Sequence, residues 1–556
     1  MDFGVRTYSS GIIDGCEYGG LSGFSHKKND FWPLHIPTHR QKRIIIVGAG
    51  VSGIQQATVL IRDKHLNHED IMVFDALEGY GGVWNKNKYP GCACDVPAMI
   101  YTTSYFVNKK WTNFFATQPQ IEQYYTDFAH HYNLEKCTQF GTLVQSCIWD
   151  EMTFKWRVTV SNKSTGVTEY WLCDYLSQCV GGLDRPKFGT TPGRENFKGT
   201  SWHTAHWRDD VDLAGKTVAI IGCGPSAAQV IPEIIDQVDH LTVYMRNPPV
   251  CVARNDFQYS RLFRWMCFWV PFFAYFVRQR MNFRMRLNMR AATNMTDEND
   301  VMTQASERFL EQEVKDEKLR EILKPHSKYY CKRPLRLDNF YSSIVKKNCT
   351  VLREPLLQFT ERGVLSQDVD TKKPNERAFD VIIFGTGFNV AQYLEHIEIK
   401  GVNGIDLQDQ WREHPEALYG LATSNFPNMF MCFGPNTATL WSSQQDNWTV
   451  QAEFAAKVIR TLDRRAGKEP GRKFAMYPTK KAEREYNDQL QVQQRKFVWA
   501  APECTSYYKN DAGWITYTMP WSYPRFWWML RNIKWMTVSN LEAELGTPFG
   551  LSPRIQ

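Results

Sequence analysis

Three short apolar runs, each followed by a glycine-rich turn, constrain the fold of this chain more than any other feature. The runs are residues 43–47, 217–221 and 381–384. They are rich in β-branched residues without polar alternation, as expected for strands buried on both faces of a parallel sheet. Strand, glycine turn and helix repeated in this way predict an α/β protein with doubly wound parallel sheets.

The first turn, GAGVSG at 48–53, has the form of a dinucleotide-binding turn. Gly48 would make the tight turn, Gly50 would let the backbone approach a pyrophosphate, and Gly53 would allow close helix–strand packing. The N-terminus of the following helix favours phosphate groups. Asp75 ends the next predicted strand and would accept hydrogen bonds from a ribose.

The second turn, GCGPSA at 222–227, predicts another nucleotide site of different charge. Where an acidic residue would hold a free ribose, the next strand ends at Arg246. A cation at this position favours a 2′-phosphate and therefore NADPH over NADH. Two dinucleotide sites of opposite charge predict one flavin, one nicotinamide and hydride transfer between them.

Length and composition limit the other classes of function. A chain of 556 residues is too long for one hydrophobic core, so two or three domains are expected. A net charge of +7 over this length is too weak to indicate a nucleic-acid partner. The 14 cysteines include no C-x-x-C pair, and the N-terminus shows no secretory pattern. We expect a cytoplasmic protein in a reducing compartment, with residues 1–40 as a surface extension.

One apolar stretch, residues 265–277, has arginines on both sides and a proline at 271. It is too short to cross a bilayer, which needs about 20 residues. We expect it to be buried in a helical insertion or to line a tunnel, and we favour this over contact with a membrane interface. Residues 281–289 alternate in polarity like a strand but have the composition of a helix.

Two gapped motifs then identify a family. The first reads Gly81-Gly82-x-Trp84-x4-Tyr89-Pro90-Gly91-x3-Asp95, and the second reads Phe197-x-Gly199-x3-His203-x3-Trp207. Together with the two turns, they resemble class B flavoprotein monooxygenases of the Baeyer–Villiger type, from about residue 43 to near the C-terminus. The sequence departs from the family at Asp75, where a glutamate is usual, and at Val83, where a threonine is usual.

The resemblance implies two dinucleotide-binding, Rossmann-like domains with FAD and NADPH as cofactors. It implies a discontinuous FAD domain, 41–188 and 381–556, with the C-terminal part also forming the substrate or lid region. The NADPH domain would be 189–380, with a helical insertion at about 250–330. Phe197, Gly199, His203 and Trp207 would couple the two domains. The implied cofactor contacts are Gly48, Gly50, Gly53, Asp75, Gly82, Trp84, Tyr89, Asp95, Gly222, Gly224, Ser226, Ala227, Arg246, Lys332 and Gly387.

The resemblance also implies the chemistry, in which a C4a-peroxyflavin attacks a ketone to give an ester or lactone. The negative charge of the peroxide needs a cation nearby. We assign that role to Arg333, with Asp95 orienting it and Lys332 as a second contact to the 2′-phosphate. We expect a bulky lipophilic ketone from secondary metabolism, bound by the apolar insertion and by loops near Trp441 and 507–514.

Three other functions are weighed against this one. Oxygenation at nitrogen or sulfur would need a protonated hydroperoxide and would depend less on Arg333. A non-catalytic, nucleotide-bound protein would not need Asp95 and Arg333 to be retained. A flavin disulfide reductase would need a separated cysteine pair, which Cys92-x-Cys94 does not supply.

Overall fold

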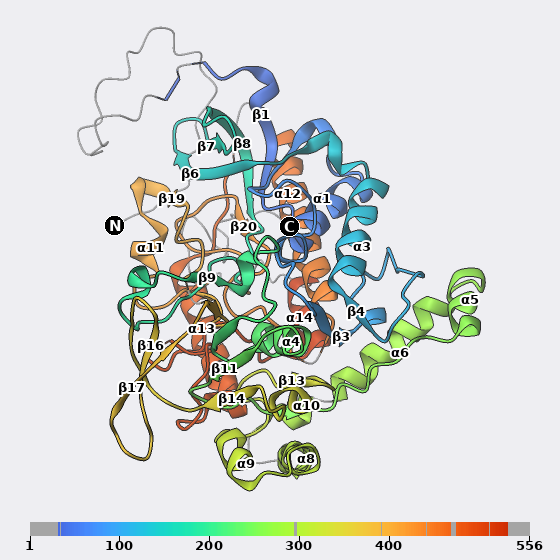
Figure 1. Ribbon diagram of the computed structural model, residues 1–556. Coiled ribbons are helices and arrows are strands. Elements are labelled where there is room, and N and C mark those ends of the chain that lie inside the picture. Colours follow the sequence, from blue (N-terminus) through green and yellow to red (C-terminus); the bar gives the residue numbers. More distant parts are fainter. Residues whose placement is uncertain are drawn as a thin grey trace.

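The computed structural model describes residues 32–33, 35–287, 289–293, 297–390, 392–440, 442–468, 474–510 and 512–531. The expected surface extension, residues 1–40, lies for the most part outside them. Within the described residues, the fold is built on two large sheets whose central strands are parallel (Figure 1).

The first sheet has the strand order β19-β6-β7-β8-β1-β2-β5, and β20 also pairs with β8. Strand β1 pairs in parallel with β2 and β8, with Ile44 opposite Ile71. Ile44 and Ile46 face one hydrophobic cluster, and Ile45 and Val47 face another. Burial on both faces explains the absence of polar alternation. The strands are β1 (Gln41–Val47), β2 (Ile71–Phe74), β5 (Thr138–Gln139), β6 (Thr142–Asp150), β7 (Lys155–Asn162), β8 (Thr168–Gln178), β19 (Glu398–Lys400) and β20 (Met429–Met431).

Helices from both ends of the chain cover one face of this sheet. They are α1 (Val51–Arg62), α3 (Gln118–His131) and α12 (Gln444–Lys468), and Figure 1 shows them beside one another. On α12, Thr449 donates from Oγ1 to Oε1 of Gln55 on α1 at 2.8 Å, across 394 positions of sequence. The first sheet is therefore completed only by the C-terminal third of the chain.

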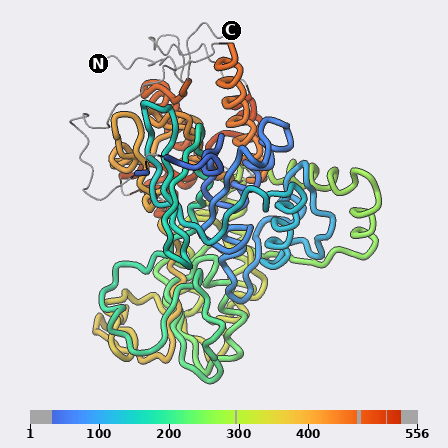
Figure 2. The backbone as a smooth tube through the Cα atoms, turned by 90° about the horizontal axis from the view of Figure 1, so that it is seen from above, coloured from blue at the N-terminus to red at the C-terminus, as the bar shows by residue number. Residues whose placement is uncertain are grey.

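The second sheet has five parallel strands in the order β14-β11-β10-β18-β9. Helix α4 (Pro225–Ile234) and the short α10 (Phe340–Ile344) pack against each other beside it. Figure 2 shows the green and yellow segments of this sheet below the blue, teal and orange segments of the first. Its strands are β9 (Thr200–His203), β10 (Thr217–Ile221), β11 (His240–Tyr244), β14 (Cys349–Leu352) and β18 (Val381–Phe384).

Strand β18 corrects one expected domain boundary. The sequence places the second part of the FAD domain from residue 381, but β18 pairs with β10 and β9 in the second sheet. The chain returns to the first sheet only at β19 and β20. The physical reason is that β18 is buried on both faces, and such a strand has the same sequence pattern in either sheet.

The helical insertion lies between β12 (Cys251–Val252) and β13 (Leu335–Arg336), which pair in parallel and close it. Residues 281–287 and 289 are helical, which settles the ambiguous alternation in favour of helix, while Asn288 lies outside the described residues. The helices of the insertion are α5 (Arg261–Trp269), α6 (Phe273–Leu287), α7 (Met289–Ala292), α8 (Asp297–Glu313) and α9 (Glu317–Leu323).

The expected burial of residues 265–277 is wrong. Trp265, Trp269 and Phe276 are between 55% and 67% exposed. Helices α5 and α6 extend away from the rest of the molecule, so only one side of them meets other elements (Figure 1). None of the helices in the described part of the chain is long and apolar enough to cross a membrane.

The remaining elements are short or lie near the C-terminus. A three-stranded antiparallel sheet, β15-β16-β17, extends the second sheet region, and β3 pairs with β4 near the first. Their bounds are β3 (Ala93–Pro97), β4 (Phe115–Thr117), β15 (Leu356–Phe359), β16 (Gly363–Gln367), β17 (Pro374–Ala378), α2 (Val83–Lys86), α11 (Leu407–Gln410), α13 (Lys480–Gln494) and α14 (Tyr523–Arg531).

Candidate active site

The first glycine-rich turn joins β1 to α1. Gly48 has φ +104°, and a Cβ there would lie 2.8 Å from the carbonyl oxygen of Cys179. A Cβ on Gly53 would lie 1.8 Å from the carbonyl oxygen of Gly48, so only glycine lets α1 approach the turn this closely. Gly50 is the N-cap of α1, and no described side chain caps the helix. The amides of the first helical turn are therefore open to phosphate, which fits the pyrophosphate of a dinucleotide.

The carboxylate of Asp75 holds this turn from the end of β2. Its Oδ2 accepts a hydrogen bond from the amide of Ala49 at 2.6 Å, and its Oδ1 accepts one from the amide of Leu77 at 2.8 Å. Burial raises the pKa of Asp75, and these two hydrogen bonds oppose the rise. The group expected to contact a ribose thus also supports the turn, and each oxygen keeps a second acceptor position.

The first family motif connects the two glycine-rich turns. A Cβ on Gly82 would lie 2.9 Å from the Cα of Gly50, so the start of the motif packs on the first turn. Farther along the motif, the buried Tyr89 donates from its hydroxyl to Oε1 of Gln229 on α4 at 3.0 Å. The sequence assigns Tyr89 to the cofactor, whereas the structure shows its hydroxyl bonded to the helix after the second turn. Both turns are therefore linked by one short segment.

The second glycine-rich turn joins β10 to α4 and packs against the end of β18. Gly222 has φ +98°, and a Cβ there would lie 2.7 Å from the carbonyl oxygen of Gly385. Gly224 is the N-cap of α4, again with no described side chain capping the helix. Ser226 lies in the first turn of α4, and Ala227 contacts Gly385 closely enough that a Cβ on Gly385 would lie 2.6 Å away. This turn also fits a dinucleotide.

Two cations lie near the second turn. Arg246 follows β11 and is exposed, and neither it nor Lys332 forms an ion pair with a described residue. Burial lowers the pKa of Lys332, and the positive charge of Arg246 lowers it further. Two neighbouring cations without a carboxylate between them fit a bound phosphate group.

Asp95 and Arg333 form a bidentate ion pair across 238 positions of sequence. Arg333 Nε lies 2.6 Å from Oδ2 of Asp95, and Nη2 lies 2.7 Å from Oδ1. The side chains are 29% and 28% exposed, and Nη1 of Arg333 makes no hydrogen bond with a described residue. Burial opposes both charges, but the pair outweighs it, lowering the pKa of Asp95 and raising that of Arg333. The guanidinium is thus charged, fixed in plane and open on one side.

Aromatic residues surround this pair. Trp84 donates from Nε1 to the hydroxyl oxygen of Tyr101 at 2.9 Å. Tyr507 and Tyr508 lie close enough to interact electrostatically with Arg333, and Tyr508 is fully buried. The start of the segment 507–514 therefore reaches the candidate site, whereas Trp441 lies outside the described residues. One pocket at the C-terminal ends of β8 and β20 is lined by Gln178, Val180, Asn389, Val390, Met431 and Phe433, among others, and its lining includes neither Asp95 nor Arg333.

Sequence reasoning misses a disulfide at this site. Cys331, directly before Lys332 and Arg333, is bonded to Cys504, which precedes Tyr507. The two cysteines are 173 positions apart, and no spacing rule connects them. They depart from the expectation that the cysteines are reduced, and the bond ties the arginine segment to the C-terminal segment.

Cys92 and Cys94 are free and buried. Burial raises the pKa of Cys92 to about 11 and that of Cys94 to about 12. Both remain protonated at neutral pH, which makes them poor nucleophiles.

The second family motif lies where the chain leaves the second sheet. His203 ends β9, accepts a hydrogen bond at Nδ1 from the amide of Ala205, and lies 5.5 Å from the ring of Phe388, which follows Gly387. Burial lowers the pKa of His203 to about 4, so the ring is neutral at pH 7. His203 therefore contacts the segment along which the chain returns toward the first sheet.

The other residues of this motif pack within the second sheet region. Trp207 meets Trp202 edge-on, with ring centroids 5.6 Å apart. Gly199 lies between the ring of Phe197 and the carbonyl of Asp380, where a Cβ would be 2.5 and 2.6 Å from the nearest atoms. Trp207 also packs against the hydrophobic cluster that contains Ala227 of the second turn, and the coupling role expected of this motif stays a prediction.

Comparison with known proteins agrees with this geometry. Residues 41–405 match the model of a family described as FMO-like, flavin-binding monooxygenase-like. The chain is 34% identical over 484 residues to the FAD-binding monooxygenase BOA2 of Botryotinia fuckeliana, covering 86% of this chain and 90% of that protein. It is 30% identical over 494 residues to a Baeyer–Villiger monooxygenase of Pseudomonas aeruginosa, covering 89% and 90%.

The fold is also that of solved enzymes. Cyclohexanone monooxygenase from Rhodococcus sp. Phi1, bound to NADP+, superimposes with a TM-score of 0.75 at 24% identity, covering 89% of this chain and 97% of that one. The geometry and the sequence comparisons therefore agree. The chain has two glycine-rich turns, each followed by a helix whose N-terminus has no side-chain cap, and it has an arginine–aspartate pair. The chain belongs to the flavin-binding monooxygenase-like family and is an FAD- and NADPH-dependent monooxygenase of the Baeyer–Villiger type.

Proposed function

We propose that this protein inserts one oxygen atom of dioxygen next to the carbonyl carbon of a bulky, lipophilic ketone, giving an ester or lactone. The observation that carries the proposal is the Asp95–Arg333 pair, which holds a charged guanidinium with Nη1 open. Relatives support a ketone, since cyclohexanone monooxygenase has been solved with cyclohexanone and with ε-caprolactone bound. A steroid monooxygenase bound to NADP is among the similar structures and supports a bulky substrate.

The two turns would hold the two cofactors. Gly48, Gly50 and Gly53 would bind FAD with Asp75, and the adjoining Gly82 and Trp84 would lie beside it. Gly222, Gly224, Ser226 and Ala227 would bind NADPH, with Gly387 nearby and with Arg246 and Lys332 on its 2′-phosphate. When bound, FAD reduced by NADPH supplies the activation of dioxygen.

The protein's own contribution would be electrostatic. Negative charge develops on oxygen as it adds to the carbonyl carbon, and a preorganised cation stabilises that charge without reorganising. Arg333 would do this through Nη1, while its other two donors stay on Asp95. Asp95 would act as a positioning residue, because it fixes the plane of the guanidinium. Tyr508 and its buried neighbours would help to exclude water.

Arg333→Ala tests this assignment. We expect the variant to bind FAD and to be reduced by NADPH, because neither turn contains this residue. Formation of ester or lactone should fall at least about a hundredfold, the scale of losing one oxyanion partner. Arg333→Lys should restore little, because the donors of an ammonium all lie on one nitrogen and cannot reproduce the planar fork that binds both oxygens of Asp95 and also places a donor at the position of Nη1. Asp95→Asn should give a milder loss.

The measurement is stopped-flow reduction of the flavin beside product yield from a ketone panel. Arg362→Ala, on an exposed turn, is the matched arginine control and should behave as wild type. Equal loss of reduction and of product would assign Arg333 to cofactor binding. Unchanged product formation would remove Arg333 from the mechanism. Oxidation of a sulfide but of no ketone by the wild type would favour heteroatom oxygenation instead.

A further inference from the structure

Helices α5 and α6 form an arm, residues 261–287, that extends from the molecule in both Figure 1 and Figure 2. A turn at Pro271 connects the two helices, and they contact each other. At its base, α6 packs against the 3-10 helix Ala98–Ile100, close after Asp95 in the sequence. The arm is therefore attached near the candidate active site and packs along one side, while its other side is exposed.

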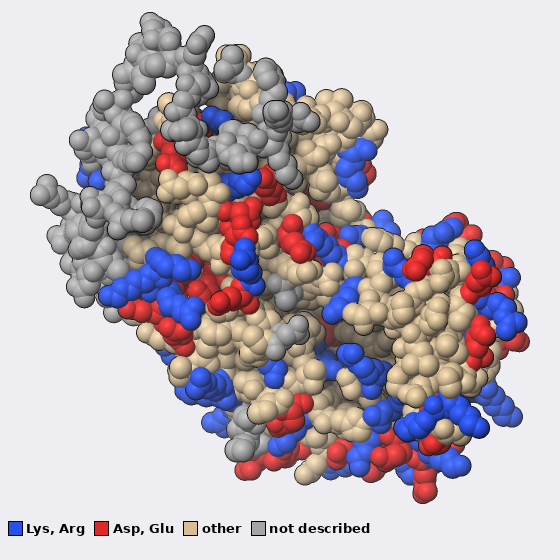
Figure 3. Space-filling model, turned by 90° about the vertical axis from the view of Figure 1, so that its left-hand side faces the viewer, with Lys and Arg blue, Asp and Glu red and all other residues tan. Residues whose placement is uncertain are grey.

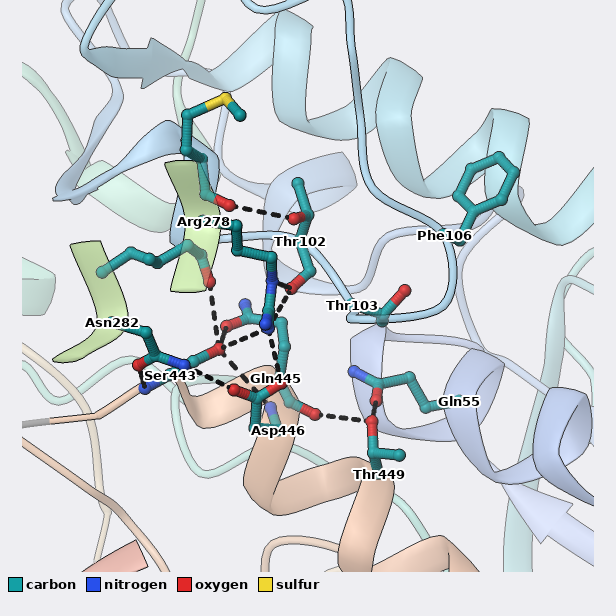
Figure 4. A network of polar contacts seen from close by, with 12 residues as sticks. Gln55, Thr102, Thr103, Phe106, Arg278, Asn282, Ser443, Gln445, Asp446 and Thr449 are labelled. Carbon is teal, nitrogen blue, oxygen red and sulfur yellow. Dashed lines mark hydrogen bonds and ion pairs between the residues drawn. The ribbon is translucent and has the colours of Figure 1, made fainter. Parts of the chain in front are cut away.

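The inner side of α6 is held in place by polar contacts in addition to apolar packing. Its buried residues, Ala274, Arg278 and Asn282, are spaced four positions apart and so share one helix face. Arg278 is fully buried and donates to Oδ1 of Asp446 and to the carbonyl oxygen of Thr102 (Figure 4). Asn282 donates to Oδ2 of the same Asp446 at 2.7 Å. Asp446 belongs to α12, so the arm is anchored to the first sheet region by charge-assisted hydrogen bonds.

The outer side of the arm is apolar. About half of the large apolar side chains that are exposed in the described part of the chain lie here. Exposed fractions reach 66% at Trp269, 74% at Phe272 and 67% at Phe276. A surface helix normally turns its apolar residues toward the core, as Phe273, Val277 and Met281 of α6 do, but the outer side of this helix is apolar as well. Contiguous exposed apolar residues of this kind mark a surface that is covered by something else.

The charge of the arm is of one sign. No aspartate or glutamate occurs between Asp256 and Asp297, whereas seven arginines do. Arg261, Arg264, Arg280 and Arg284 are exposed, and none of the four forms an ion pair with a described residue. On the face drawn in Figure 3, by contrast, acidic and basic side chains are interspersed.

We propose that the arm docks on an anionic lipid surface, lying in the headgroup region without crossing the bilayer. Aromatic side chains, tryptophan above all, partition into that region, and unpaired arginines are attracted to anionic headgroups. Helices of nine and 15 residues are too short to span the bilayer, but they suit insertion parallel to its plane. A fluid anionic surface complements four unpaired arginines without requiring the matched acidic positions that a protein partner would have to supply.

Vesicle flotation of the full-length, FAD-loaded protein tests the proposal. We expect wild type to float with phosphatidylcholine vesicles that contain about one-third phosphatidylserine, and to float much less with phosphatidylcholine alone. Trp269→Ser/Phe272→Ser/Phe276→Ser should lower the bound fraction at least tenfold, because each side chain loses apolar burial. Arg261→Gln/Arg264→Gln should lower it about 25-fold at low salt, at about fivefold for each charge near the surface.

The matched control is Met152→Ser/Val369→Ser/Val492→Ser, which removes three exposed apolar residues away from the arm and should float as wild type does. Bound FAD and NADPH oxidation confirm that each variant is folded, and these readouts should not change. Wild type that stays unbound with both vesicle types overturns the proposal. So does flotation of both arm variants at the wild-type level. An arm variant that becomes smaller in solution while wild type does not float assigns the surface to a second copy of the chain.

Discussion

Arg246 and Lys332 come from separate segments of the chain, yet the charge of one lowers the pKa of the other. The two cations repel each other, and a bound anion would offset this repulsion. The position of Arg246 after β11 was predictable from the sequence, and its role in choosing between a hydroxyl and a phosphate stays a prediction. Its proximity to Lys332 required the fold.

Arg246→Ala should therefore change the choice of cofactor. We expect KM for NADPH to rise roughly 10- to 100-fold, which corresponds to about 1.5–3 kcal/mol for a charge-assisted contact. KM for NADH should change little. Steady-state kinetics with both cofactors measures this, and Arg353→Ala, at an arginine paired with His326, is the control. Equal effects on NADPH and NADH would show that Arg246 does not read the phosphate.

Single residues also show where sequence reasoning ends. Asp95 and Arg333 could be paired in advance only through the family motif, and the structure brings them together. Tyr89 belongs to the same motif, and the bond from its hydroxyl to α4 could not be foreseen from the motif, while its expected contact with the cofactor stays a prediction. Cys331 and Cys504 gave no signal at all, since disulfide pairing depends on the folded path of the chain.

At the scale of elements, the disulfide holds β13 and its preceding arginine against the C-terminal segment. Cys504→Ser should lower the free energy of unfolding by about 2–4 kcal/mol, the usual effect of opening a long loop. Ester or lactone formation should also fall, because Arg333 follows Cys331 by two positions. Urea denaturation with and without dithiothreitol measures the first effect.

Cys349→Ser, at a free and half-buried cysteine, is the matched control and should leave the response to dithiothreitol unchanged. Wild type in dithiothreitol should resemble Cys504→Ser. Identical stability of wild type and Cys504→Ser without reductant would contradict the role assigned to this bond.

Element types were more predictable than their partners. The apolar strands and glycine turns, β1 with α1 and β10 with α4, follow from local pattern alone. The sheet to which β18 belongs does not, because both-face burial gives the same pattern in any parallel sheet. The exposure of α5 and α6 could not be predicted from the sequence either. An apolar run has the same composition whether the rest of the protein or another surface covers it.

At the scale of the whole molecule, His203 joins the second sheet to the segment that returns to the first. Its pKa is about 4, below the ordinary value of 6.5, so between these values the unfolded chain binds the proton more tightly than the folded one. The protonation of His203 therefore leaves the free energy of unfolding unchanged above about pH 6.5 and lowers it as the pH falls toward 4. The buried ring thus contributes to acid unfolding of the interface.

His203→Asn should reduce this pH dependence. Asparagine can still accept the amide of Ala205 but does not titrate, so the loss of stability from pH 7 to pH 4.5 should be smaller by on the order of 2 kcal/mol. Urea midpoints at both pH values measure it. His326→Asn, at an exposed histidine, should keep the wild-type difference. A variant at His203 with the full wild-type loss would show that this ring does not titrate as inferred.

The packing of α12 on α1 has a consequence for synthesis. Gln55 and Thr449, which bond across these helices, are 394 positions apart. At a translation rate of about 5–20 residues per second, roughly 20–80 s pass between the two. During that interval the apolar side of α1 has been made but the helix that covers it has not. The glycine-rich turn at Gly48 thus leaves the ribosome long before the helix that completes its surroundings.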